Sequence, residues 1–161
     1  MNIFTFVLAL IGSLGTAYSV IMTFYWHRIS IDCSIVEYCP TKDSLIAYMS
    51  FTNHSRLPIS ITDICVWNDC VLYSCVHTPE IVKTVSRTMN NVENYQEAIH
   101  SASLPINLPS LSGTSGYVYF LFPQENFEVS SKSLTVELST NRHATLRKTL
   151  SLEKSLHIAQ Q

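Results

Sequence analysis

An uncharged apolar segment from Ile3 to Trp26 is the feature that most constrains the fold of this chain. At about 1.5 Å per residue, a helix of this length measures roughly 36 Å, which crosses a hydrocarbon core of roughly 30 Å. The segment ends in Tyr25 and Trp26, and the basic residue Arg28 follows. Aromatic residues followed by a cation are typical of a membrane–water interface. We therefore predict a transmembrane anchor over residues 1–27, with Tyr25, Trp26 and Arg28 as its interface anchors.

A cleaved signal peptide is the alternative for this segment, because Gly15, Thr16 and Ala17 offer the small residues that a signal peptidase reads. No Lys or Arg precedes the apolar run, and the run continues beyond Ala17 to Trp26. Both features favour an uncleaved helix.

The side of the membrane on which the following domain lies is predicted from basic residues near the span. Arg28 and Lys42 follow the span and no basic residue precedes it, so the positive-inside rule favours the cytosol over export. Five cysteines are an odd number and too few for a disulfide scaffold, which also favours a reducing compartment.

Small residues recur at a spacing of four along the predicted span, at Ala9, Ser13 and Ala17. Residues at this spacing share one face of a helix, and small side chains let a second helix approach closely in lipid. We expect this face to pack against a second copy of the chain or another membrane protein. The alternative is that these residues reflect the ordinary composition of membrane helices.

Residues 28–161 are predicted to form one all-β domain, because short segments with a two-residue apolar period are separated by turn signals. Segments 29–34, 45–53 and 57–64 are expected to form an antiparallel meander. Residues 66–73 are expected to form a tight hairpin in which Trp67 lies opposite Cys70. Such regularly spaced strands are typical of a two-sheet antiparallel β-sandwich.

The later segments complete the predicted sandwich. Residues 104–109 carry two prolines and suit an edge strand, whereas 117–122 are apolar on both faces and suit the centre of a sheet. Residues 134–152 suit a hairpin. Residues 79–100 fit either a helix or an exposed strand followed by a mobile loop at 90–94, and we favour the strand. The glycines at 113 and 116 predict a flexible loop around Ser115.

The segments Ser50–Ile61, Ser103–Leu108 and Gly116–Phe122, together with the N-terminal span, give the chain a family resemblance. It resembles small, uncharacterised single-span membrane proteins of Gram-positive bacteria and their prophages. This resemblance implies that the sandwich is immunoglobulin-like, and it implies no activity and no functional residue.

Candidate catalytic and metal-binding residues are sparse in the sequence. Cys65, Cys70, Cys75 and His77 form a cluster, but their spacing does not fit structural zinc, and cysteine commonly serves as a small core residue. Cys65 and Cys70 are expected to lie diagonally across the hairpin, too far apart for a disulfide. We therefore assign no catalytic residue, no cofactor and no metal ligand from the sequence.

The charge pattern argues against a nucleic-acid partner. The formal net charge is −2, and nucleic-acid binders concentrate Lys and Arg on one surface. Arg147 and Lys148 belong to a basic C-terminal stretch, but neighbouring residues on a strand point to opposite faces. We expect them to lie on a solvated strand surface.

These observations predict a membrane-anchored interaction or accessory module. It would contact lipid through its helix and a second copy or another membrane protein through a sheet face or the loops near residues 89–100 and 112–116. One alternative is an envelope hydrolase or redox enzyme that uses Cys75 and His77. Another is a membrane assembly factor that acts through the helix and is regulated by the β domain.

Overall fold

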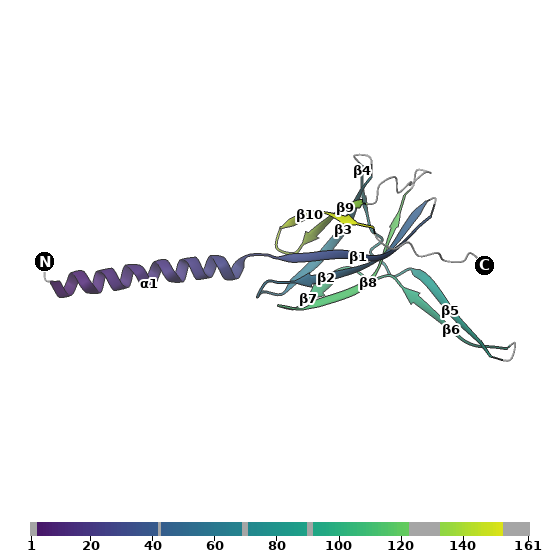
Figure 1. Ribbon diagram of the computed structural model, residues 1–161, viewed down its shortest axis with the longest axis horizontal. Coiled ribbons are helices and arrows are strands. Elements are labelled where there is room, and N and C mark those ends of the chain that lie inside the picture. Colours follow the sequence, from purple (N-terminus) through teal and green to yellow (C-terminus); the bar gives the residue numbers. More distant parts are fainter. Residues whose placement is uncertain (1–2, 42, 69–70, 90–91, 123–132, 153–161) are drawn as a thin grey trace.

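The computed structural model describes residues 3–41, 43–68, 71–89, 92–122 and 133–152, which form mostly β-structure behind one N-terminal helix (Figure 1). The helix, α1, spans Ile3–His27. The strands, in chain order, are β1 (Ile31–Pro40), β2 (Ser44–Asn53), β3 (Ile59–Asn68), β4 (Val71–Ser74), β5 (Ile81–Met89), β6 (Val92–His100), β7 (Ile106–Leu108), β8 (Gly113–Leu121), β9 (Ser133–Thr140) and β10 (Thr145–Ser151).

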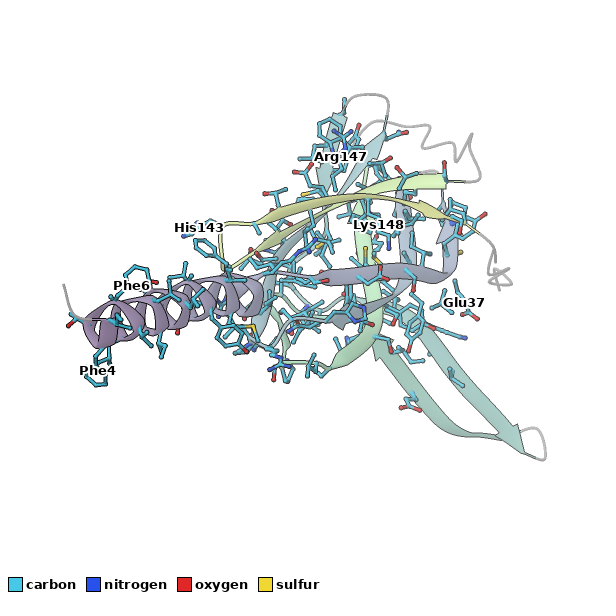
Figure 2. The ribbon with its side chains drawn as sticks, turned by 60° about the vertical axis from the view of Figure 1, so that its left-hand side comes forward. Phe4, Phe6, Glu37, His143, Arg147 and Lys148 are labelled. Atoms are coloured by element: carbon cyan, nitrogen blue, oxygen red, sulfur yellow. The ribbon has the colours of Figure 1, made fainter. Side chains whose placement is uncertain are left out.

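Helix α1 extends away from the β-structure as a single rod (Figure 1). Between Ile3 and Phe24 it is long and apolar enough to cross a membrane, and it contributes no buried residue to the fold. Phe4 and Phe6, for example, are 76% and 55% exposed, and both project from the helix far from the strands (Figure 2). The predicted helix is confirmed, and its boundaries agree with the uncharged segment.

Two antiparallel sheets form the body of the β-structure. The first has the order β1-β2-β8, and the second has the order β10-β9-β3-β4 with β7 paired to β3. Their inward side chains meet in one hydrophobic core, which contains Phe51 of β2 and Phe120 of β8 from the first sheet and Ile64 of β3 and Val136 of β9 from the second. This arrangement is consistent with a β-sandwich.

The predicted three-strand meander is only partly correct. β1 and β2 pair as expected, but the segment that follows them, β3, belongs to the other sheet. The polar connection after Asn53 carries the chain across the sandwich, and the amide of His54 bonds back to the carbonyl of Ser30. A polar connection that reads as a hairpin turn in the sequence therefore serves as a crossover between sheets.

Strand β8 was expected at the centre of a sheet and instead lies at the end of one. Its partner is β2, which is the central strand. Both faces of β8 are apolar for different reasons: Val118 and Phe120 enter the core, while Tyr117 packs against the ring of Tyr48 at 4.8 Å on the other face. An aromatic pair on the outer face explains the pattern that suggested a central strand.

Strands β5 and β6 form a two-stranded hairpin that projects from the sandwich, here called the arm (residues 81–100; Figure 1). The expected strand at 81–89 is confirmed, and the helical alternative is wrong. The loop expected at 90–94 is wrong for residues 92–94, which begin β6, while 90–91 lie outside the described residues. At the base of the arm, the amide of Ser101 donates to the carbonyl of Glu80 at 2.8 Å.

The flexible loop expected around Ser115 is also wrong, because residues 113–116 begin β8 and pair with β2. A Cβ atom at Gly113 would lie 3.0 Å from the backbone oxygen of Phe51. Glycine is required here by the close approach of two strands, not by flexibility.

Candidate functional site

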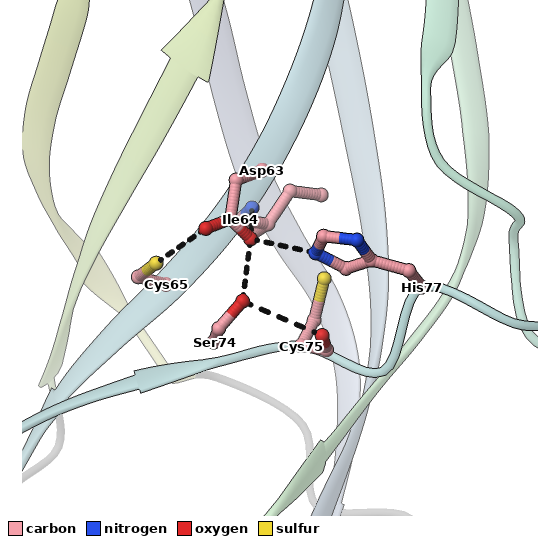
Figure 3. A network of polar contacts seen from close by, with 6 residues as sticks. All are labelled: Asp63, Ile64, Cys65, Ser74, Cys75 and His77. Carbon is pink, nitrogen blue, oxygen red and sulfur yellow. Dashed lines mark hydrogen bonds and ion pairs between the residues drawn. The ribbon is translucent and has the colours of Figure 1, made fainter.

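The described residues bring a carboxylate, two thiols, a hydroxyl and an imidazole together at the edge of the sandwich, a group that we call the Asp63 cluster (Figure 3). Its members are Asp63, Cys65, Ser74, Cys75 and His77. The candidate ligand atoms of Asp63, Cys75 and His77 lie within 4.8 Å of one another.

Strand β3 supplies the carboxylate and one thiol. Its pairing with β9 shifts by one residue between Ile61 and Asp63, as at a β-bulge. Ile61 lies in the core before the shift and Ile64 lies in the core after it. Asp63 and Cys65 therefore share the other face of the strand, two residues apart.

The chain after β4 supplies the second thiol and the imidazole. The amide of Cys75 donates to the carbonyl of Ile64 at 2.8 Å, and the next amide, of Val76, donates to Tyr119 at 2.8 Å. Cys75 also forms a β-bridge with Phe120. At this point the chain passes from one sheet to the other, so that main-chain hydrogen bonds to both sheets hold Cys75 beside Asp63.

The carboxylate of Asp63 is the hydrogen-bonding centre of the cluster. Its Oδ1 accepts a hydrogen bond from Ser74 Oγ at 2.6 Å and lies 3.2 Å from His77 Nε2, while its Oδ2 accepts from Cys65 Sγ at 3.3 Å. Desolvation by burial raises the pKa of this carboxyl, but the hydrogen bonds from Ser74, Cys65 and His77 outweigh it and hold the pKa below its usual value. Asp63 is therefore an ionised acceptor at neutral pH.

The two thiols are poor nucleophiles in this environment. Burial raises the pKa of Cys75 to about 12, and the negative charge of Asp63 adds to the effect. Burial and the hydrogen bond to Asp63 raise the pKa of Cys65 to about 12 as well. Because the thiolate is the reactive form, these shifts oppose a thiol hydrolase or redox role at neutral pH.

The expected hairpin register at 66–73 is wrong, which explains why sequence reasoning missed Asp63. Trp67 pairs with Leu72, not with Cys70, and Cys65 pairs with Ser74. This register places Asp63 close to the residues after Ser74. Cys70 lies outside the described residues, so the expectation that it forms no disulfide with Cys65 stays a prediction.

The other cysteines and histidines that the structure describes lie apart from the Asp63 cluster. Cys33 and Cys39, like Cys65 and Cys75, are buried and free. His54, His100 and His143 are exposed.

The predicted helix-packing residues Ala9, Ser13 and Ala17 are all exposed on α1. Their role in helix packing stays a prediction. Arg28 is exposed just after the helix, and its role as an interface anchor stays a prediction. The side chains of Tyr25 and Trp26 lie outside the described residues.

The two basic residues on β10 contact different parts of the domain (Figure 2). The guanidinium of Arg147 lies over the ring of Trp67, 4.2 Å from its centroid. Lys148 forms an ion pair with Asp32 of β1. Their opposite orientations are as expected for neighbouring strand residues.

Comparison with known proteins gives no family for this chain. No family model matches it, and no curated protein matches it. Among solved structures, a beta-glucosidase from Kluyveromyces marxianus aligns with 80% of this chain and 15% of its own length, at 12% identity and a TM-score of 0.30. A likeness of this size carries no argument about fold or activity.

Proposed function

We propose that the chain is a single-pass membrane protein whose immunoglobulin-like sandwich acts as an interaction or accessory module for another membrane protein. The observation that carries the proposal is the exposure of α1 beside a hydrophobic core to which it does not contribute. The buried core residues of the described part lie between Cys33 and Leu152, and none of the described side chains of the helix is among them. Because the core of the domain does not use this apolar helix, the exposed apolar surface of the helix is best explained by burial in a lipid bilayer.

The polar residues of α1 are compatible with lipid. The hydroxyls of Ser13, Thr16, Ser19 and Thr23 donate to backbone carbonyls three or four residues earlier, at 2.8–2.9 Å. In a bilayer, such groups have no water to bond, so satisfaction within the helix removes most of the cost of burying them.

The arm is the element that we assign to partner binding. Within the described residues, β5 and β6 pair with each other and with no other strand, and Ile81 at the base is 61% exposed. A projecting hairpin has free edges that a partner's strand can join, and its length reaches beyond the sandwich. The arm includes residues 89–100, which the sequence suggested as a contact region.

We place the module in the cytosol. Arg28 and Lys42 follow α1 in the sequence, and the buried thiols of Cys33, Cys39, Cys65 and Cys75 are unpaired, which suits a reducing compartment.

The anchor is tested by fractionation of the full-length protein. It should stay in the membrane pellet after washes at high salt and at alkaline pH. Release by either wash, or a mature chain that starts at Tyr18, would refute an uncleaved anchor.

The module is tested by site-specific photo-crosslinking in native membranes. A crosslinker at Thr84 or Ala98, which face each other across the arm, should yield a discrete adduct with another membrane protein. The matched control is an exposed site on β10, Thr149. Adducts that are equal at all three sites, or absent from the arm, would contradict a binding role for the arm.

A thiol hydrolase is the second candidate, because the carboxylate of Asp63, the imidazole of His77 and the thiol of Cys75 lie within 4.8 Å of one another. Such an enzyme needs a reactive Cys75 thiolate. Labelling of the folded protein by iodoacetamide should be slower at Cys75 than in the urea-denatured protein; faster labelling in the folded state would favour the hydrolase.

A further inference from the structure

The Asp63 cluster contains three kinds of metal-binding atom at one point of the fold. They are a carboxylate oxygen of Asp63, the sulfur of Cys75 and a ring nitrogen of His77 (Figure 3). Zinc accepts all three in tetrahedral sites. We propose that these residues form a zinc-binding site whose fourth position is open to solvent. The inference does not depend on the proposed function.

The separations of these atoms are close to those of a zinc site. With metal–ligand distances of about 2.0–2.3 Å, the ligand atoms of a tetrahedral centre lie about 3.3–3.8 Å apart. His77 Nε2 and Asp63 Oδ1 are already 3.2 Å apart, and the largest separation in the group is at most 4.8 Å. An adjustment of about 1 Å completes the geometry. The side chain of His77 is 55% exposed and has room to make it.

The backbones that carry the three ligands are fixed. Asp63 lies on the paired strand β3, and Cys75 is hydrogen-bonded to Ile64. The carbonyl of His77 accepts a hydrogen bond from the amide of Leu104 at 3.3 Å. Holding the backbone while one side chain rotates keeps the entropy cost of binding low.

Hydrogen bonds also orient the carboxylate. Cys65 donates to Oδ2 of Asp63, whereas His77 lies beside Oδ1. Oδ1 also accepts hydrogen bonds from Ser74 Oγ at 2.6 Å and from the amide of Ile64 at 2.8 Å, so a metal at Oδ1 would replace the contact with His77 and share the oxygen with these two donors. Neighbours that orient a ligand in this way commonly raise metal affinity.

The charges of the group suit zinc in a partly buried place. Binding displaces the thiol proton of Cys75 to solvent. A divalent ion then held by one carboxylate, one thiolate and one neutral imidazole has a net charge of zero, which limits the cost of burial. The ion-pair partner of Asp63 within the described residues is His77 itself, so no Lys or Arg competes there for the carboxylate. Calcium and magnesium prefer oxygen ligands, and the sulfur and nitrogen therefore select a softer ion.

The experiment measures zinc binding by the full-length protein in detergent. After removal of metal with a chelator, the protein is titrated with zinc and its retained metal is measured by mass spectrometry. We expect one zinc per chain. Cobalt in place of zinc should give the charge-transfer absorption of a thiolate–cobalt bond.

Variants distinguish this site from adventitious binding. His77→Ala should weaken zinc binding by more than about 100-fold, because losing a ligand costs more than losing a group that orients one. Its control is His54→Ala, which removes an exposed histidine elsewhere. Cys75→Ser should abolish the cobalt–thiolate absorption, and its control is Cys33→Ser, at an equally buried thiol.

Because Cys75 lies in the core, its variant is first checked for folding by circular dichroism. If it does not fold, the exposed variant His77→Ala and the conservative variant Asp63→Asn decide the question. The proposal is overturned if the wild-type protein retains no zinc, or if these variants bind zinc as tightly as it does.

Discussion

The side-chain amide of Asn53, at the end of β2, donates a hydrogen bond of 2.9 Å to the backbone carbonyl of Pro109, just after β7. The same amide donates to the carbonyls of Leu57 and Leu108, and its oxygen accepts from the amide of Ser55 at 2.9 Å. Asn53 is fully buried. The amide of Asn53 therefore joins the end of β2, in one sheet, to two segments beside β3, in the other sheet. These segments are the connection that precedes β3 and the end of the short strand β7.

Replacement of this amide is expected to be costly. Asn53→Ala removes the donor from one buried carbonyl, of Leu108, and from the part-buried bonds to Leu57 and Pro109, and an unsatisfied buried group costs about 1–3 kcal/mol. We expect a loss of about 2–4 kcal/mol in the free energy of unfolding, measured by urea denaturation. Asn141→Ala, at an exposed asparagine that accepts one bond from Ser60, should cost less than about 1 kcal/mol. Equal losses in the two variants would contradict a special role for Asn53.

The two glycines of β8 offer a matched comparison. A Cβ at Gly113 would meet the backbone oxygen of Phe51 at 3.0 Å, whereas a Cβ at Gly116 would meet only the Cβ of Ala102 at 3.3 Å. Backbone in a paired strand yields less than a side chain, so Gly113→Ala should cost about 1–3 kcal/mol of unfolding free energy. Gly116→Ala should stay within about 1 kcal/mol of the wild type. The reverse order, measured by urea denaturation, would show that the close approach at Gly113 does not matter.

The strands could be predicted from the sequence, but their assignment to the two sheets could not. Two-residue periodicity located most strands, because one buried face imposes alternation wherever a sheet covers a core. It could not say which sheet a strand joins. The polar residues after Asn53 read as a turn, whereas the pairing of β3 with β9 in the other sheet shows that they form a crossover, which the buried amide of Asn53 supports.

The Asp63 cluster was missed for a related reason. Spacing along the chain places Cys75 beside His77, but the carboxylate comes from a neighbouring strand whose register the sequence analysis predicts wrongly. A bulge between Ile61 and Asp63 further changes which face Asp63 occupies. Periodicity cannot predict a site that depends on a one-residue shift in strand pairing, because such a shift moves the following side chains to the other face of the strand.

Acid should remove the contribution of the ion pair between Asp32 and Lys148. The hydrogen bond from Lys148 is the main cause that holds the pKa of Asp32 below its usual value of 3.8. A depressed carboxyl pKa stabilises the fold above the unfolded-state value, and this stabilisation is lost as pH falls through the folded-state value. Because the pair is exposed, Asp32→Asn should cost less than about 1 kcal/mol at pH 7.

The measurement is the difference in unfolding free energy between wild type and Asp32→Asn across a pH series. The difference should shrink toward zero as the pH falls below the folded-state pKa of Asp32. Lys148→Met should show the same trend, and the double variant should lose no more than either single one. A difference that persists undiminished in acid would mean that the pair is not its source.

The last prediction concerns the small-residue face of α1, defined by Ala9, Ser13 and Ala17. In lipid, the hydrophobic effect does not drive helices together, because acyl chains are as apolar as the helix surface. Close packing of the backbones must therefore supply the attraction between helices. Ser13 already satisfies its hydroxyl by donating to the carbonyl of Leu10 at 2.9 Å, which leaves a compact, nonpolar surface at this face. A second α1 could therefore approach there without leaving a polar group unpaired.

The double variant Ser13→Leu and Ala17→Leu should weaken self-association in a membrane two-hybrid or crosslinking assay, because the larger side chains hold the two backbones apart. Tyr18→Leu is the control. At about 100° per residue, Tyr18 lies about 140° around the helix from Ser13, away from the proposed contact. It should leave association unchanged. If the double variant associates as strongly as the wild type, or if the native helix does not associate at all, the small residues belong to the ordinary composition of a membrane helix and α1 serves only as an anchor.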